Sequence, residues 1–154
     1  MTKLQPDAAL ASEIVWFDAY VTNVDRTPRN PNMLFWHRTL YLIDHGAALY
    51  FHHAWGDYLA QARSPFARIA DHVLLPLARD LAGADARLRP RLTPETIATT
   101  VAQIPQEWLD EPAFPDPEAH RAAYAAYLEA RLATADSFLS AAVAAQAELS
   151  GALR

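Results

Sequence analysis

The stretch NVDRTPRNPNMLFWHRTLYLIDHG, residues 23–46, decides the fold. It contains two short apolar runs, MLFW and TLYLI, separated only by HR. Runs of this length, rich in aromatic and branched residues, predict the two strands of a tight antiparallel hairpin. Asp25, Asn30 and Asn32 precede the hairpin and Asp44 follows it. Because an antiparallel pair begins and ends at the same edge, we expect these side-chain oxygens to converge there.

The register of the hairpin follows from the position of its turn. We place the turn at about Arg38, so residues whose numbers sum to about 76 lie opposite each other. Asn32 then faces Asp44. Neither run alternates polar and apolar residues, so both faces of the hairpin are expected to be covered.

Helical periodicity dominates the rest of the chain. Asp7 is placed to cap a helix that ends near Asn23, and Thr93 followed by Pro94 opens another. The predicted helical stretches are 8–23, 54–62, 64–88, 93–104 and 117–153, the last being one long helix or a pair broken near Thr134 to Asp136. The fold class is therefore mainly α: a helical bundle with a small antiparallel β-hairpin.

Composition limits the class of protein. A chain of 154 residues that is 52% apolar suits one domain over 1–154, with residues 1–7 as a flexible N-terminus. The net charge of −5 and scattered basic residues argue against nucleic-acid binding. No apolar run is long enough to span a membrane and no signal peptide is recognisable, so we expect a cytoplasmic protein.

Two scarcities exclude common nucleotide motifs. Lys3 is the only lysine, and the four glycines are too far apart to form a phosphate-cradling loop. The chain has no cysteine, which excludes disulfides, thiolate metal sites and a cysteine nucleophile. What remains is the group of carboxylate and amide oxygens at the hairpin, which are hard ligands of the kind that bind Mg²⁺ together with phosphate oxygens.

Ordinary structural roles compete with this chemistry. Asp25 and Asn30 are also typical turn formers, and Arg26 and Arg29 could be solvated or bonded to carboxylates. The histidines are expected to be packed, structural or exposed rather than metal ligands. Dense aromatic residues favour a core under the hairpin, and the terminal helix carries an apolar stripe with a charged edge. These aromatic residues are Trp16, Phe17, Trp36, Tyr50, Phe51, Trp55, Tyr58 and Phe66, and the stripe is Tyr124, Tyr127, Leu128, Arg131 and Leu132.

The order of the motifs resembles the catalytic lobe of protein kinases. Asp25 and Asn30 have an Asp-x4-Asn spacing, an apolar hairpin follows, and Asp44, His45 and Gly46 stand where kinases have Asp-Phe-Gly. The passage from IVWFDAYVTNVDRTPRNPNML to LYLIDHGAALYFHHAW resembles a bacterial HipA-like kinase family, in which this chain corresponds to the C-terminal lobe.

The resemblance implies a role for each residue. Asp25 would be the catalytic base, and Asp44 would bind Mg²⁺ that bridges the phosphates of ATP. Asn30 would be a metal ligand by its spacing, although Asn32 is better placed by the hairpin register. Gly46 would let the chain turn away without a side chain. Arg26 and Arg29 are near enough to contact phosphate.

The N-lobe of a kinase, with its lysine, glutamate and glycine-rich loop, is expected to be absent from these residues. We therefore expect little phosphoryl transfer unless another polypeptide supplies an N-lobe. The uncovered apolar face would bind that partner or a second copy. Two alternatives stay open: a non-catalytic interaction or regulatory module on a degenerate kinase lobe, and a metal-dependent phosphoesterase that uses the same oxygens.

Overall fold

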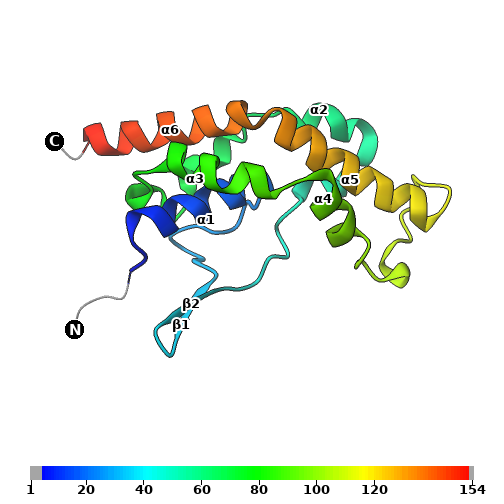
Figure 1. Cartoon of the computed structure of the whole chain (residues 1–154), viewed down its shortest axis with the longest axis horizontal. Helices are drawn as coiled ribbons and strands as arrows, with labels where there is room; N and C mark the ends of the chain where they lie inside the picture. The colour runs from blue at the N-terminus through cyan, green and yellow to red at the C-terminus, as the bar shows by residue number, and fades with distance from the viewer. Residues whose placement is uncertain (1–4, 153–154) are drawn as a thin grey trace.

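The computed structural model describes residues 5–152, and these residues form a mainly helical body with one two-stranded sheet (Figure 1). Short 3-10 turns connect several of the elements. The helices and strands are α1 (Ala8–Tyr20), β1 (Met33–Trp36), β2 (Thr39–Leu42), α2 (Tyr58–Ala62), α3 (Leu81–Leu88), α4 (Pro94–Val101), α5 (Pro117–Ala133) and α6 (Ala135–Ala152). This arrangement confirms the predicted fold class.

Helix α1 is the centre of the main core. Asp7 caps it by accepting a hydrogen bond from the Leu10 amide at 2.8 Å, as predicted, but the helix ends at Tyr20, before the predicted end near Asn23. Trp16 is buried, packs edge-on against Phe138 of α6, and donates its indole N–H to Asp85 of α3 at 2.8 Å. The first helix is therefore held by elements from the middle and the end of the chain.

The hairpin forms where the sequence predicts it, but its register differs by one residue. Met33 pairs with Leu42 and Trp36 with Thr39, so Ile43 rather than Asp44 lies opposite Asn32. The reason is the two-residue turn, in which His37 and Arg38 both take left-handed backbone angles, φ 46° and 67°. That geometry matches the twist of the strands, but HR carries none of the usual sequence signal for it.

Only one face of the hairpin is covered, which corrects the expectation for both faces. Met33, Leu40 and Leu42 pack against the main core. Leu34, Trp36 and Tyr41 point the other way and are exposed, Trp36 to 57%. The hairpin stands out from the helices in Figure 1. Trp36 thus lies outside the core, as do Phe17 and Tyr50, whereas Trp16, Phe51 and Phe66 are buried as predicted.

The predicted helix over 64–88 is broken into two 3-10 turns, Ala67–Asp71 and Leu75–Leu77, followed by α3. Phe66 takes a left-handed φ of 54° before the first turn, and His72 is extended after it. Each deviation interrupts the hydrogen-bond ladder that a continuous helix requires. The C-terminal stretch is a pair of helices that break at Thr134, one of the two arrangements that the sequence allows.

Arg131 of α5 makes hydrogen bonds to α1, to α2 and to the segment that follows α2. Its guanidinium is completely buried and donates to the carbonyl oxygens of Ala19 (2.7 Å), Tyr20 (3.3 Å), Ala62 (3.1 Å) and Ser64. Burial lowers the pKa of Arg131 to about 10, partly opposed by Tyr127 and Tyr20. Arg131, which the sequence pattern predicts at a charged edge, is therefore buried and links α5 to α1 and α2 by hydrogen bonds.

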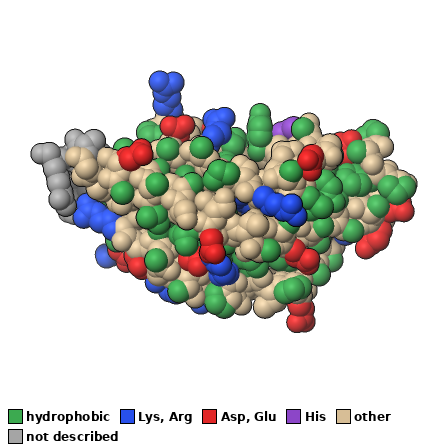
Figure 2. Space-filling view, turned by 90° about the horizontal axis from the view of Figure 1, so that it is seen from above, with side chains coloured by type: hydrophobic (Ala, Val, Ile, Leu, Met, Phe, Trp, Pro, Cys, Tyr) green, Lys and Arg blue, Asp and Glu red, His purple; other side chains and the backbone are tan. Residues whose placement is uncertain are grey.

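The surface carries both signs of charge. On the face that Figure 2 shows, acidic and basic side chains are interspersed rather than gathered into one basic patch. Within residues 5–152, no helix is long and apolar enough to cross a membrane.

Candidate functional site

Two loops meet at the base of the hairpin and bring Asp25, Asn30 and Asn32 together, while Asp44 reaches this group through its backbone carbonyl oxygen. Asn30 donates its side-chain amide to Asp25 Oδ2 at 2.7 Å. Asn32 donates to the same carboxylate oxygen at 3.5 Å and to the carbonyl oxygen of Asp44 at 3.4 Å. Asn32 therefore bridges the loop before β1 and the loop after β2, although it is not directly opposite Asp44 in the register.

The backbone holds this arrangement in two ways. Thr27 and Asn30 exchange backbone hydrogen bonds at 3.1 Å, which closes a tight turn between Asp25 and the hairpin. The loop is also attached to the chain after β2, because the Val24 amide donates to Ala47 at 3.3 Å. The spacing of the motif residues in space is thus set by turns and by pairing of the two loops.

The chain turns away from the hairpin at Asp44 and again at Gly46, where the Ala48 amide closes a turn by donating to the carbonyl oxygen of His45 at 2.9 Å. Asp44 has a left-handed φ of 52° and Asn32, across the hairpin, has one of 47°. Aspartate and asparagine tolerate this conformation better than other non-glycine residues. A Cβ at Gly46 would meet only Asp44 Oδ1, at an ordinary 3.6 Å. Gly46 therefore lies where the chain turns, although neither a positive φ nor a close contact requires a glycine there, and His45 beside it is exposed.

Metal-ligating capacity at this site comes from carboxylates and amides. Among the residues that the structure describes, no three His, Cys, Asp or Glu side chains gather where they could hold a metal ion. Asp25 is half-buried and Asp44 is exposed. Both asparagines use their Nδ2 atoms, and within residues 5–152 neither Oδ1 atom accepts a hydrogen bond. The side chains that the structure gathers are the Asp25 carboxylate and two amides, and carboxylate and amide oxygens are the kind of ligand that suits a hard cation such as Mg²⁺.

Arg26 and Arg29 differ in their surroundings. Arg26 is buried, donates to both carboxylate oxygens of Asp18, and donates to the carbonyl oxygen of Asn32. It is therefore bonded to a carboxylate, the competing structural role expected for it from the sequence, and its buried guanidinium does not face a phosphate at the surface. Arg29 is exposed on the same loop.

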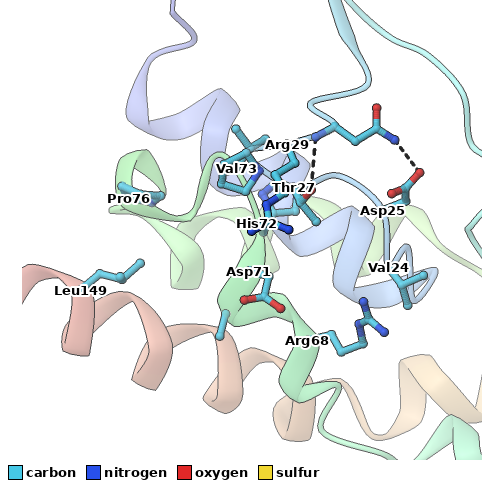
Figure 3. A pocket seen from close by; sticks show the side chains of 13 residues that line it. Val24, Asp25, Thr27, Arg29, Arg68, Asp71, His72, Val73, Pro76 and Leu149 are labelled. Atoms are coloured by element: carbon cyan, nitrogen blue, oxygen red, sulfur yellow. Dashed lines mark hydrogen bonds between the residues drawn. The ribbon is translucent and has the colours of Figure 1, made fainter.

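Residues of the same loop line a cleft of about 740 Å³ (Figure 3). Asp25 lies at one end of it, next to Val24 and Arg68, and Leu149 of α6 lies at the other. The remaining lining residues are Thr27, Pro28, Arg29, Asn30, Ala70, Asp71, His72, Val73 and Pro76. Asp25 thus lines the cleft and is also bonded to Asn32, while Asn30 lines the cleft and is bonded to Asp25.

Sequence reasoning missed Asp18, which lies beneath the loop. It is 0% exposed, accepts from Arg26 and contacts His72 at 2.9 Å. Burial raises the pKa of Asp18, but hydrogen bonds from His72 and Arg26 and the charge of Arg26 outweigh it, so the pKa is lowered overall. A signal was present, since Asp18 lies three and four residues after Val15 and Ile14 on the apolar face of α1.

Comparison with known proteins identifies the family of the chain. A family model described as HipA-like kinase matches residues 2–140. Neither the curated proteins nor the solved structures include a match to this chain. The match spans α1, the hairpin, both loops of the site and most of the helical body. The chain therefore belongs to the HipA-like kinase family.

Proposed function

We propose that this chain is the catalytic lobe of a HipA-like serine/threonine kinase, which transfers phosphate from Mg-ATP when an N-lobe completes it. The observation that carries the proposal is the position of Asp25. Its carboxylate is bonded to Asn30 and Asn32 on the side of Asp44, and it also lines the cleft. A base that receives a hydroxyl proton during phosphoryl transfer has to stand between the nucleotide and the acceptor in this way.

The residues fit magnesium. Asp44 and the Oδ1 atom of Asn30 or Asn32 would hold the ion, which would neutralise charge on the phosphates of ATP. The donor set contains only oxygens, and hydrogen bonds already orient both asparagines. The two amides donate to Asp25 through Nδ2, which leaves their carbonyl oxygens as the atoms available to a cation.

The acceptor would approach through the cleft. A hydroxyl group at its Asp25 end would lie beside the carboxylate that orients it and takes its proton. Arg29 and Arg68 line the same cleft and are exposed, so they would contact the anionic groups of the acceptor or of the transferred phosphate. These residues supply positioning and charge, which make up most of phosphoryl-transfer catalysis.

The nucleotide base and the rest of the triphosphate need partners that residues 5–152 do not supply. The only sheet among these residues is the hairpin, whose outer face exposes Leu34, Tyr41 and Ile43 next to Asp44. This apolar face would form one wall of a nucleotide site, and an N-lobe would form the other. The same exposed face favours the alternative function, a non-catalytic module that binds a partner or a second copy there.

Thermal unfolding with ligands tests the proposal. The wild type is measured alone, with Mg²⁺, with ATP and with both, beside Asp44→Asn and the control Asp110→Asn, an exposed aspartate outside the site. Asparagine is chosen because it keeps the left-handed backbone at position 44. Mg-ATP at about 100 times its dissociation constant should stabilise the wild type by about 2.7 kcal/mol.

We expect Asp44→Asn to lose this stabilisation and Asp110→Asn to keep it. A wild type that Mg-ATP does not stabilise, or an equal shift in Asp44→Asn, would reject the nucleotide–metal site and favour the interaction module. Where the shift is selective, adding a separately expressed N-lobe and comparing wild type with Asp25→Asn shows whether phosphate is transferred. Metal-dependent cleavage of a simple phosphoester without ATP would instead identify a phosphoesterase.

A further inference from the structure

The buried carboxylate of Asp18 is the meeting point of three hydrogen-bonded paths. Its side chain is 0% exposed on α1, below the loop that carries the candidate catalytic residues. Three side chains from outside α1 bond to its two oxygens: Asn23, Arg26 and His72. An acid buried this completely is costly unless its charge is paired and its oxygens are bonded, and here both conditions are met.

The first path leads to Asp25. Asn23 donates its amide to Asp18 Oδ1 at 3.1 Å. The other end of the same amide, Oδ1, accepts the backbone N–H of Asp25 at 3.2 Å. One side chain thus connects the buried carboxylate to the backbone of the candidate base.

The second path leads to Asn32. Arg26 donates through Nε and Nη2 to Asp18, and its Nη1 donates to the carbonyl oxygen of Asn32. That oxygen also accepts the amide of Ile43, the residue before Asp44. Asn32 has a left-handed backbone conformation. The hydrogen bond from the charged Arg26 to its carbonyl oxygen therefore holds the Asn32 peptide in place, and with it the side-chain amide that is the candidate metal ligand.

The third path leads to the wall of the cleft. His72 Nδ1 accepts the Leu74 amide at 3.0 Å, so the imidazole proton is on Nε2, which donates to Asp18 at 2.9 Å. The neighbouring Val73 amide donates to the carbonyl oxygen of Arg26 at 3.0 Å. His72 and Val73 both line the cleft, so the same carboxylate ties this wall to the loop.

We propose that Asp18 is a positioning residue that sets Asp25, Asn32 and the cleft wall at His72 relative to one another. The role of this positioning in catalysis rests on the proposed function. Its effect on the order of the loop can be tested without any phosphoryl transfer. The inference assigns a role to a residue that contacts neither metal, nucleotide nor acceptor. Arg26 takes part in this positioning, because its guanidinium is paired with Asp18 and also donates to the carbonyl oxygen of Asn32.

Four variants separate positioning from simple stability. Asp18→Asn removes the charge and leaves Arg26 unpaired. Asn23→Ala breaks only the path to Asp25 and is the milder test if Asp18→Asn does not fold. The double variant Asp18→Asn/Arg26→Met removes both charges, which should recover stability because no buried charge is left alone. Ser12→Ala is the matched control.

Ser12 is also a completely buried polar residue of α1, where it donates to Ala8 at 2.6 Å and accepts the Asp80 amide at 2.9 Å. Its partners lie away from the site. Ser12→Ala should therefore lower stability without changing the loop.

Two measurements are made on the full chain. Amide hydrogen exchange reports the order of the loop through Thr27, Asn30 and Val73, whose amides are all bonded. Electron paramagnetic resonance of Mn²⁺ reports the affinity of the metal site. We expect the three Asp18 and Asn23 variants to exchange faster at these amides and to bind Mn²⁺ about 10- to 100-fold more weakly, as loss of an outer-shell partner does elsewhere.

Asn23→Ala carries the decisive result, because it breaks the path to Asp25 and leaves the Asp18–Arg26 pair intact. Faster exchange and weaker Mn²⁺ binding in this variant support positioning, whereas wild-type exchange and Mn²⁺ binding show that Asp18 acts only on stability and overturn the inference. Ser12→Ala with the same loop changes would overturn it as well. If the wild type binds no Mn²⁺, the proposed metal site fails, and loop exchange alone then decides the role of Asp18.

Discussion

Asn30 donates its side-chain amide to Asp25 at 2.7 Å, across the tight turn that separates the two residues in the sequence. The structure thus joins the two ends of the Asp-x4-Asn motif directly, whereas Asn32 reaches the same carboxylate at 3.5 Å. The bond orients the Asn30 amide while its carbonyl oxygen stays available to a cation. Under the proposed function both asparagines are candidate metal ligands, and separate measurements distinguish them.

Separate substitution of the two asparagines tells them apart. We expect Asn30→Ala to weaken Mn²⁺ binding about 10- to 100-fold if its oxygen is a ligand. Asn32→Gly removes the other amide and keeps the left-handed backbone at that position. Titration followed by electron paramagnetic resonance gives the two affinities. An unchanged affinity in Asn30→Ala with a loss in Asn32→Gly would transfer the role to Asn32.

Removal of Arg131 should strongly destabilise the protein. Arg131→Met keeps much of the side-chain volume but leaves four buried carbonyl oxygens without this donor. Hydrogen bonds to a charged group are worth about 1.5–3 kcal/mol each, so the total loss should be at least about 3 kcal/mol. Urea unfolding measures it. Arg63→Met, at an exposed position, should change stability by no more than about 0.5 kcal/mol, and a similar effect of both variants would contradict the prediction.

The stability of the fold should fall in mild acid because of His120. This ring lies between Phe114 and Tyr124, 4% exposed, and within residues 5–152 neither of its nitrogens has a hydrogen-bond partner. Burial lowers the pKa of His120 below the ordinary 6.5, although Glu111 and Asp110 oppose the shift. The unfolded chain therefore takes up this proton first, so the stability is complete above about pH 6.5 and is lost as the pH falls through the lowered folded value.

His120→Phe tests this dependence. Phenylalanine should fit the aromatic stack and remove the two buried polar atoms, which raises stability by about 1–3 kcal/mol. The free energy of unfolding should then vary less between pH 7 and pH 5 than in the wild type. Some variation should remain, because burial also lowers the pKa of His52, to which the nearby His53 and His120 contribute. Equal pH profiles for variant and wild type would be inconsistent with this assignment.

The exposed face of the hairpin should contribute to association rather than to folding. Leu34→Thr and Trp36→Thr alter side chains that are 48% and 57% exposed, so stability should change by no more than about 0.5 kcal/mol. Met33→Thr, one residue away but packed against the core, should cost about 1 kcal/mol or more. Sedimentation velocity of the wild type and the outward variants then shows whether this face drives self-association. A large loss of stability in the outward variants would show that the face is covered.

Local sequence signals predicted much of the fold. The cap at Asp7, the strands around HR and the cap at Thr93 each depend on neighbouring residues, and the structure contains all three. The hairpin register was wrong by one residue because a turn built from His37 and Arg38 has no glycine or asparagine to mark it. A one-residue error is enough to exchange the two faces of a strand.

Long-range burial was harder to predict. The sequence indicates that Asp25, Asn30 and Asn32 approach each other, because all three lie within one short loop. It does not indicate that Arg26 is buried against Asp18, since the pairing depends on how the loop folds back over α1. Arg131 shows the same limit, because its partners are carbonyl oxygens from segments distant in the sequence.

The left-handed backbone at Asn32 and Asp44 has a consequence for comparing relatives of this chain. A position that needs both this conformation and a side-chain oxygen admits aspartate and asparagine, while a position that needs only the conformation also admits glycine. Family members that keep the hairpin but do not bind a metal ion there should therefore more often have glycine at these two positions. Retention of Asp or Asn at both would mark the lineages in which selection still acts on the oxygens.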